Sequence, residues 1–214
     1  MERNKKQIPW FYSFARGVVT PIISLLYRVK FTNRDNIPEN GAYIIISNHL
    51  SNVDPVIMGM GQRKRKLHFM AKAELFKNKF FAGLITALGA FPVFRGEGVD
   101  QEAISTGEDI LKEGGVMVIF FEGKRSKTGE FLRPKTGAML IAHATNTPIV
   151  PACITPEKKL MKVFRKTRVS FGEPVTPEQL GIDVNNPVPN PRELRNASKK
   201  VMGMLEEMRS KEVF

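Results

Sequence analysis

The sequence predicts one α/β domain with a mostly parallel central sheet flanked by helices, preceded by a pair of N-terminal helices. Apolar segments rich in β-branched residues alternate with amphipathic segments along most of the chain. The segment Val116–Phe121 is apolar throughout, as expected for a strand buried on both faces. The chain has 214 residues, of which 42% are hydrophobic, so it suits one full domain. We therefore divide it into residues 1–30, the N-terminal helices, and residues 31–214, the main domain.

The expected strands and helices follow one another in alternation. Strands are predicted over residues 42–47, 66–71, 90–94, 116–121, 148–154 and 166–171. Helices are predicted from about residue 54 and over residues 75–88, 101–112, 135–145 and 194–208. The helix near residue 54 is expected to begin at Asp54-Pro55, because aspartate suits an N-cap and proline the first turn. Residues 175–191 contain four prolines and are interpreted as a loop.

The composition indicates an anionic partner and a reducing compartment. A formal net charge of +12 and a pI near 9.9 fit nucleic acid, an acidic membrane face or phosphorylated substrates, and charge alone does not choose among them. Cys153 is the only cysteine and lies in an apolar run, so we expect a buried, inert thiol and no intramolecular disulfide. With three histidines in the chain, little material remains for a metal centre.

The N-terminal segment resembles an interfacial anchor more than a membrane span. Arg16 interrupts its apolar run, Pro21 should kink it, and the longest uncharged stretch, Gly17–Tyr27, has 11 residues where a span needs about 20. Placed on a helix, the polar residues form one narrow stripe and apolar residues cover the rest. The stripe consists of Ser13, Arg16, Thr20 and Ser24. We expect two helices lying in one leaflet of a bilayer. The alternative is a helix packed on the core of its own domain.

A histidine and an aspartate mark the end of the first buried strand. His49 leaves the strand, and Asp54 follows five residues later at the expected start of a helix. The turn between them can bring the carboxylate to one ring nitrogen, leaving the other nitrogen free to accept a proton. This spacing by itself is a weak signal. Since no G-x-S-x-G pattern occurs, Ser47 and Ser51 are poor nucleophiles, and a substrate hydroxyl is expected to attack.

Cationic side chains follow two further strands. Arg95 ends the apolar segment 91–94, and Glu122-Gly123-Lys124-Arg125 follows the central strand. Guanidinium groups bind phosphate through paired hydrogen bonds, and Gly123 permits a tight turn. The arrangement predicts a phosphate site at the strand ends. Taken separately, each segment could also be an ordinary solvated loop.

Five motifs in this order resemble the glycerolipid acyltransferase family, which includes the 1-acyl-glycerol-3-phosphate acyltransferases. The first is the Asn-His-x4-Asp stretch of residues 48–54. The others are Lys-x-Glu-Leu at 72–75, an apolar strand ending in arginine at 91–95, Phe-Glu-Gly-Lys-Arg-Ser at 121–126, and Ile-Val-Pro at 149–151. Phe121 stands where proline is usual in the family, and Lys124 where threonine is usual. The combination is specific, whereas no single motif is.

The resemblance implies a role for each matched residue. His49 and Asp54 would form the catalytic dyad. The acceptor site would comprise Lys72, Arg95, Glu122, Gly123, Lys124 and Arg125. The family takes acyl chains from acyl-CoA or from acyl carrier protein as co-substrate, and needs no metal and no bound cofactor. The apolar helix expected over residues 75–88 would line the acyl channel or touch lipid; ordinary core packing is its alternative.

We therefore expect transfer of a fatty acyl group to the free hydroxyl of a lysophosphatidic acid, giving phosphatidic acid, at the cytoplasmic face of the cell membrane. The expected partners are membrane lipid, lysophosphatidic acid and the acyl donor. Glycerol 3-phosphate or another lysophospholipid is an alternative acceptor. A non-catalytic, basic nucleic-acid-binding protein is an alternative of another class, supported by the cationic runs 63–66 and 158–168. The sequence contains no recognisable nucleic-acid motif, and these runs are expected to attract anionic lipids instead.

Overall fold

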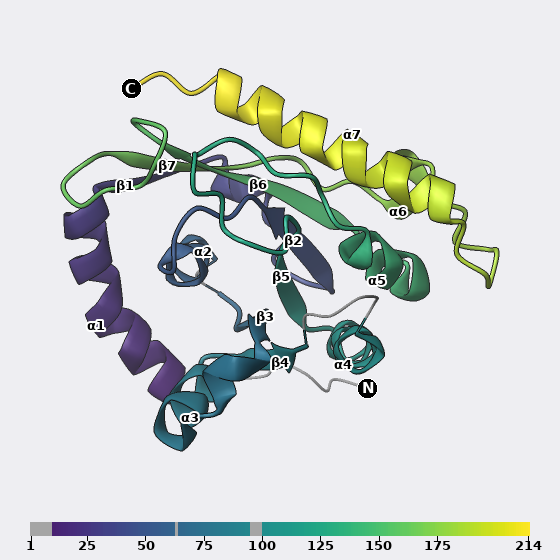
Figure 1. Cartoon of the computed structure of the whole chain (residues 1–214), viewed down its shortest axis with the longest axis horizontal. Coiled ribbons are helices and arrows are strands. Elements are labelled where there is room, and N and C mark those ends of the chain that lie inside the picture. Colours follow the sequence, from purple (N-terminus) through teal and green to yellow (C-terminus); the bar gives the residue numbers. More distant parts are fainter. Residues whose placement is uncertain (1–9, 63, 95–99) are drawn as a thin grey trace.

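The computed structural model describes residues 10–62, 64–94 and 100–214 and contains a seven-stranded sheet (Figure 1). The strand order is β1-β7-β6-β2-β5-β3-β4. The strands are β1 (Val29–Thr32), β2 (Tyr43–Ser47), β3 (Leu67–Lys72), β4 (Ala90–Val93), β5 (Val116–Phe120), β6 (Ile149–Pro156) and β7 (Thr167–Phe171). Every neighbouring pair is parallel except β6 and β7. The predicted α/β class with a mostly parallel sheet is confirmed.

Helices cover both faces of this sheet. They are α1 (Trp10–Tyr27), α2 (Asp54–Gly61), α3 (Lys79–Ala87), α4 (Gln101–Lys112), α5 (Gly137–Thr145), α6 (Pro177–Leu180) and α7 (Pro191–Ser210), with short 3-10 turns η1 (Arg34–Asn36) and η2 (Ala73–Phe76). One core lies between the sheet and α4, α5 and α7. A second core lies between the sheet and α2, with α1 at its margin.

The central position of β2 in the sheet explains its uninterrupted apolar sequence. Alternate side chains point to opposite faces, so Ile44 and Ile46 enter the first core, while Tyr43 and Ile45 enter the second. All five residues of β2 are buried. A strand in the middle of a two-faced sheet has no solvent side, which removes the apolar–polar alternation of half-exposed strands.

Three elements differ from the predictions. The helix predicted over residues 75–88 is divided into η2 and α3, because the Asn78 side chain accepts a hydrogen bond from the Phe81 amide and starts a new helix. The loop predicted over residues 175–191 contains α6, which begins with a capping box between Thr176 and Gln179. Strand β1 was not predicted; its four residues alternate between half-buried and exposed and depend on parallel pairing with β7.

The N-terminal segment forms one continuous helix where we expected a pair. Helix α1 runs from Trp10 to Tyr27 with Pro21 inside it, and the expected kink does not divide it. Residues 1–9 lie outside the described residues. Among the described helices, none combines the length and the apolar character that crossing a bilayer requires.

The end of β2 is fastened to β6 by a buried asparagine. The Asn48 amide nitrogen donates to the Ile154 carbonyl at 3.0 Å, and its amide oxygen accepts from the Ile154 N–H at 2.8 Å. Asn48 is fully buried, so both bonds are shielded from water. This pair of bonds fixes the strand end from which the next residue, His49, projects.

We expect Asn48→Ala to lower the free energy of unfolding by roughly 2–3 kcal/mol, because it leaves the backbone groups of Ile154 buried and unpaired. Urea denaturation measures the change. Asn185→Ala, at an exposed position before α7, is the matched control and should change stability by less than about 0.5 kcal/mol. If the two variants had equal free energies of unfolding, the Asn48 hydrogen bonds would contribute nothing to stability.

Candidate active site

The two residues of the predicted dyad meet in a turn between β2 and α2. The Nδ1 atom of His49 lies 2.7 Å from Oδ2 of Asp54. His49 follows the end of β2 by two residues, and Asp54 is the first residue of α2. The strand and the helix therefore hold the two side chains from opposite ends of the turn.

The Asp54 carboxylate also organises the turn itself. Its Oδ2 accepts hydrogen bonds from the backbone N–H of Leu50 at 2.6 Å and from that of Ser51 at 2.8 Å. The expected role of Asp54 as N-cap is wrong, because Val53 occupies that position and the carboxylate points back to the turn. Asp54 is completely buried, so these bonds persist without competition from water.

The geometry leaves one histidine nitrogen available for chemistry. An ionised carboxylate only accepts hydrogen bonds, so the proton of neutral His49 lies on Nδ1, and Nε2 keeps its lone pair. The imidazole stacks on the Phe120 ring with centroids 4.3 Å apart and planes 18° from parallel. The His49 side chain is 15% exposed, enough for a substrate to reach it. The role of Phe120 was missed, because nothing in an apolar strand distinguishes the aromatic ring that will face the histidine.

The loop after β5 reaches the same turn. Gly123, with φ of +71°, forms a tight turn in which its N–H donates to the Phe120 carbonyl at 3.0 Å. Three residues later the Ser126 N–H donates to the His49 carbonyl at 2.8 Å. The exposed side chains of Lys124 and Arg125 are therefore carried to the dyad turn.

A cleft of about 440 Å³ lies at this junction. It is lined by Leu50, Ser51, Lys124, Arg125, Ser126, Lys127, Leu160 and Met161. The lining includes three cations and three apolar side chains, a combination that suits an anionic head group joined to an apolar chain. Leu160 and Met161 come from the turn between β6 and β7, which the sequence did not connect with the site.

Of the other predicted acceptor residues, Lys72 does not line this cleft and Arg95 is not described by the structure. Lys72 lies at the end of β3, two strands away from β2, and pairs with Glu74 at 2.8 Å. Arg95 lies within residues 95–99, outside the described residues. The phosphate-binding roles assigned to both remain predictions.

Glu122 is buried behind the cleft and does not line it. Only 2% of the residue is exposed, and neither carboxylate oxygen has a partner in hydrogen-bonding geometry among the described residues. Burial raises the pKa of Glu122 to about 7, and the negative charge of Asp54 adds to the shift. The charge of Arg209 opposes it, as do the nearby backbone amides of Leu132 and His49, although neither amide makes a well-formed hydrogen bond to the carboxylate. The contact between Glu122 and an acceptor remains a prediction.

Arg209 supports the cationic loop from the far end of the chain. Its Nη1 donates to the Gly129 carbonyl at 2.8 Å, and its guanidinium lies 3.7 Å from the centre of the Phe131 ring. Helix α7 thereby holds the segment that carries Lys124 and Arg125. No sequence signal identified this arginine, which is one of several cations along α7.

The single cysteine takes no part in the site. Cys153 is completely buried in β6, and burial raises the pKa of its thiol, as predicted for an inert cysteine. Among the described residues, no three metal-ligating side chains gather at one place.

Residues 28–155 match the model of the family described as Acyltransferase, a range that includes all five sequence motifs. The chain belongs to the acyltransferase family. The sequence-based identification is thereby confirmed, as is the expectation of a transferase.

Relatives of this acyltransferase agree with the assignment. A protein of Bacillus subtilis named 1-acyl-sn-glycerol-3-phosphate acyltransferase is 34% identical over 166 residues, covering 77% of this chain and 82% of the relative. A Streptococcus pneumoniae protein of the same name is 32% identical, covering 80% of this chain and 66% of the relative. The fold resembles the crystal structure of the 1-acyl-sn-glycerophosphate acyltransferase PlsC from Thermotoga maritima, with a TM-score of 0.72 and 23% identity over 100% of this chain and 86% of that one.

The raised pKa of Glu122 predicts a specific pH dependence of stability. The folded protein holds this proton up to about pH 7, whereas the unfolded chain releases it near pH 4.5, so stability falls as pH rises between these values. Glu122→Gln cannot ionise and should escape this loss, which amounts to on the order of 3 kcal/mol. Thermal melts at pH 5 and pH 8 test this: the variant should gain stability over the wild type at pH 8 but not at pH 5. A gain of equal size at both values would contradict the assignment.

Proposed function

We propose that this protein transfers a fatty acyl group from a thioester to the free hydroxyl of 1-acyl-glycerol-3-phosphate, giving phosphatidic acid. The observation that carries the proposal is the oriented pair of His49 and buried Asp54 beside a cleft lined by cations. The names of the Bacillus and Streptococcus relatives support the choice of acceptor.

In the proposed reaction His49 acts as the general base. Its Nε2 removes the proton from the acceptor hydroxyl, whose oxygen attacks the thioester carbonyl. The tetrahedral intermediate then collapses, the carbon–sulfur bond breaks, and the leaving thiolate takes the proton from the imidazolium. Asp54 holds the ring in the required tautomer and stabilises the imidazolium while it exists. A base so placed contributes typically about 10²–10⁴-fold to the rate.

The cationic loop would position the acceptor. Lys124 and Arg125 line the cleft beside the turn that carries His49, where they can bind the acceptor phosphate. Binding the phosphate there brings the hydroxyl of the same molecule to Nε2, which is chiefly a positioning effect. The mechanism calls for no metal and no bound cofactor, and the donor is acyl-CoA or acyl carrier protein.

We expect His49→Ala to abolish transfer and Asp54→Asn to lower kcat by orders of magnitude, because the asparagine favours the wrong histidine tautomer. Purified protein in detergent is offered both donors against lysophosphatidic acid, glycerol 3-phosphate and other lysophospholipids. His143→Gln, a change in α5 remote from the dyad, is the control and should remain active. Turnover by either dyad variant near the wild-type rate would refute the mechanism. A preference for another acceptor would correct the substrate alone.

We further propose that the enzyme works at the cytoplasmic face of the membrane as a peripheral or monotopic protein, with α1 lying in one leaflet. The outer face of α1 is apolar: Phe14, Val18, Ile22 and Leu25 are all exposed, and Leu25 to the extent of 73%. They recur at the spacing of one helix face.

The inner face of α1 is mixed in character. Thr20 and Ser24 of the polar stripe are half-buried, while Ile23 packs against the second core. A helix that packs on its own domain normally turns its apolar face inward and its polar face to water. The row of exposed apolar side chains on α1 suits a helix with lipid outside. Helix α3, which has no buried residue and exposes Phe80, Phe81 and Leu84, extends the apolar surface.

The outer face of α1 can be tested without disturbing the core. The triple change Val18→Ser, Ile22→Ser and Leu25→Ser should weaken binding to anionic vesicles at least about tenfold, at about 25 cal/mol per Å² of apolar surface. The thermal melt should change little, because these side chains are exposed. Ile23→Ser is the matched control on the inner face and should lower the melting temperature. If the outer-face variant unfolded and still bound vesicles, α1 would be a core helix rather than an anchor.

A further inference from the structure

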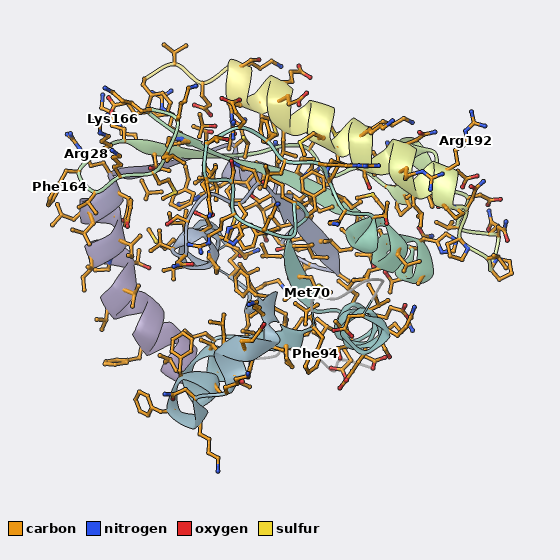
Figure 2. The ribbon with its side chains drawn as sticks, in the orientation of Figure 1. Arg28, Met70, Phe94, Phe164, Lys166 and Arg192 are labelled. Carbon is orange, nitrogen blue, oxygen red and sulfur yellow. The ribbon has the colours of Figure 1, made fainter. Side chains whose placement is uncertain are left out.

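The turn between β6 and β7, residues 157–166, exposes an apolar tip among cations. Val163 and Phe164 lie at the tip, with Phe164 69% exposed. Phe164 points outward at the edge of the molecule, near Arg28 and Lys166 (Figure 2). The turn carries the exposed or half-buried cations Lys158, Lys162, Arg165 and Lys166, and exposed Arg28 lies near Phe164 (Figure 2). Within the described part of the chain, none of these five makes an ion pair.

The backbone holds Phe164 in this position. Its φ of +66° lies in the left-handed region, which bulky residues seldom adopt and which asparagine or glycine tolerates better. Its N–H donates to the Leu26 carbonyl in the last turn of α1 at 2.5 Å. The left-handed backbone conformation and the exposure of the aromatic ring to water both lower the stability of the protein. A phenylalanine at this position therefore points to a contact outside the protein.

Residues of the same turn also line the active-site cleft. Leu160 and Met161 line the cleft beside Lys124 and Arg125, and Met161 also packs against the second core. Val163 follows Met161 by two residues. The tip and the cleft wall are therefore parts of one short turn, tied at one side to α1 and at the other to the site.

We propose that this turn is a second membrane contact, in which Val163 and Phe164 enter the interfacial layer of an anionic bilayer and the neighbouring cations bind lipid phosphates. The proposal rests on the membrane-surface reaction proposed above. An apolar tip within a cationic turn matches the two layers of such a surface, acyl chains beneath and anionic head groups above. Contact through both α1 and the turn places the cleft at the lipid surface, where a lysolipid can pass to His49 without crossing water.

A tryptophan introduced at the tip reports the contact directly. In a Trp10→Phe background, the Phe164→Trp variant should show a blue-shifted emission with phosphatidylcholine–phosphatidylglycerol vesicles, and brominated lipids should quench it. Val188→Trp in the same background is the matched control, since Val188 is an exposed apolar residue of the loop before α7. Its emission should not change. An unshifted emission from the Phe164→Trp variant in protein that sediments with vesicles would overturn the proposal, as would a blue shift that depends on protein concentration without lipid.

Affinity provides the second measurement. Val163→Ser with Phe164→Asn keeps a residue that tolerates the left-handed backbone, and should weaken vesicle binding on the order of tenfold. Val188→Ser should leave binding unchanged. Replacing Lys162, Arg165 and Lys166 by glutamine should reduce binding to vesicles containing phosphatidylglycerol and not to neutral ones. The same change at three exposed cations in the first half of α7, Arg192, Arg195 and Lys199, is the control. Arg192 lies at the opposite end of the molecule from Phe164 (Figure 2). Equal effects of the tip and control variants would contradict the proposal.

The proposed reaction and the proposed membrane contact can be refuted independently of each other. Transfer to a short-chain, water-soluble acceptor without vesicles tests the chemistry alone. Activity in that assay, together with an unshifted emission from the Phe164→Trp variant, would remove the membrane contact and keep the reaction. A blue shift in a protein inactive toward every acceptor would keep the contact and remove the reaction.

Discussion

The site depends on one oxygen atom, Oδ2 of Asp54, which accepts three hydrogen bonds inside the protein. One comes from the His49 imidazole and two come from the backbone of Leu50 and Ser51. The same atom therefore orients the imidazole of His49 and shapes the turn between His49 and Asp54. Because Asp54 is fully buried, it cannot exchange these donors for water. A shift of this side chain would alter the histidine and the cleft wall together.

The parallel sheet assembles the rest of the site around that turn. Strands β2, β5 and β6 are neighbours and parallel, so the loops that follow them leave at one edge of the sheet. Backbone bonds join the loops: the Ser126 N–H bonds the His49 carbonyl, and Asn48 bonds both backbone groups of Ile154. The Ser126–His49 bond thus holds the backbone of the loop from which the exposed side chains of Lys124 and Arg125 project.

The surface beside the site is organised in the opposite sense to an ordinary soluble domain. Helix α1 exposes the apolar residues Phe14, Val18, Ile22 and Leu25, and the β6–β7 turn exposes Phe164 among cations. In the arrangement we propose, lipid covers the apolar side chains that are exposed on that side. The cleft lies next to this surface because Leu160 and Met161 belong to the same turn as the exposed tip. Access of a membrane-borne substrate and attachment of the protein then have one structural basis.

The sequence by itself determined the strands β2 and β5, the bounds of α4, the position of the dyad and the family, because these depend on local periodicity and on short motifs. The tertiary structure alone decided which cations share the cleft, that Glu122 is buried, that Phe120 stacks on His49 and that Arg209 supports a loop some eighty residues before it in the chain. It also decided that Thr20 and Ser24 of α1 are half-buried while Val18, Ile22 and Leu25 are exposed. Periodicity along a chain shows that a segment has two faces, but which face meets the protein depends on the segments packed against it, and these are distant in sequence.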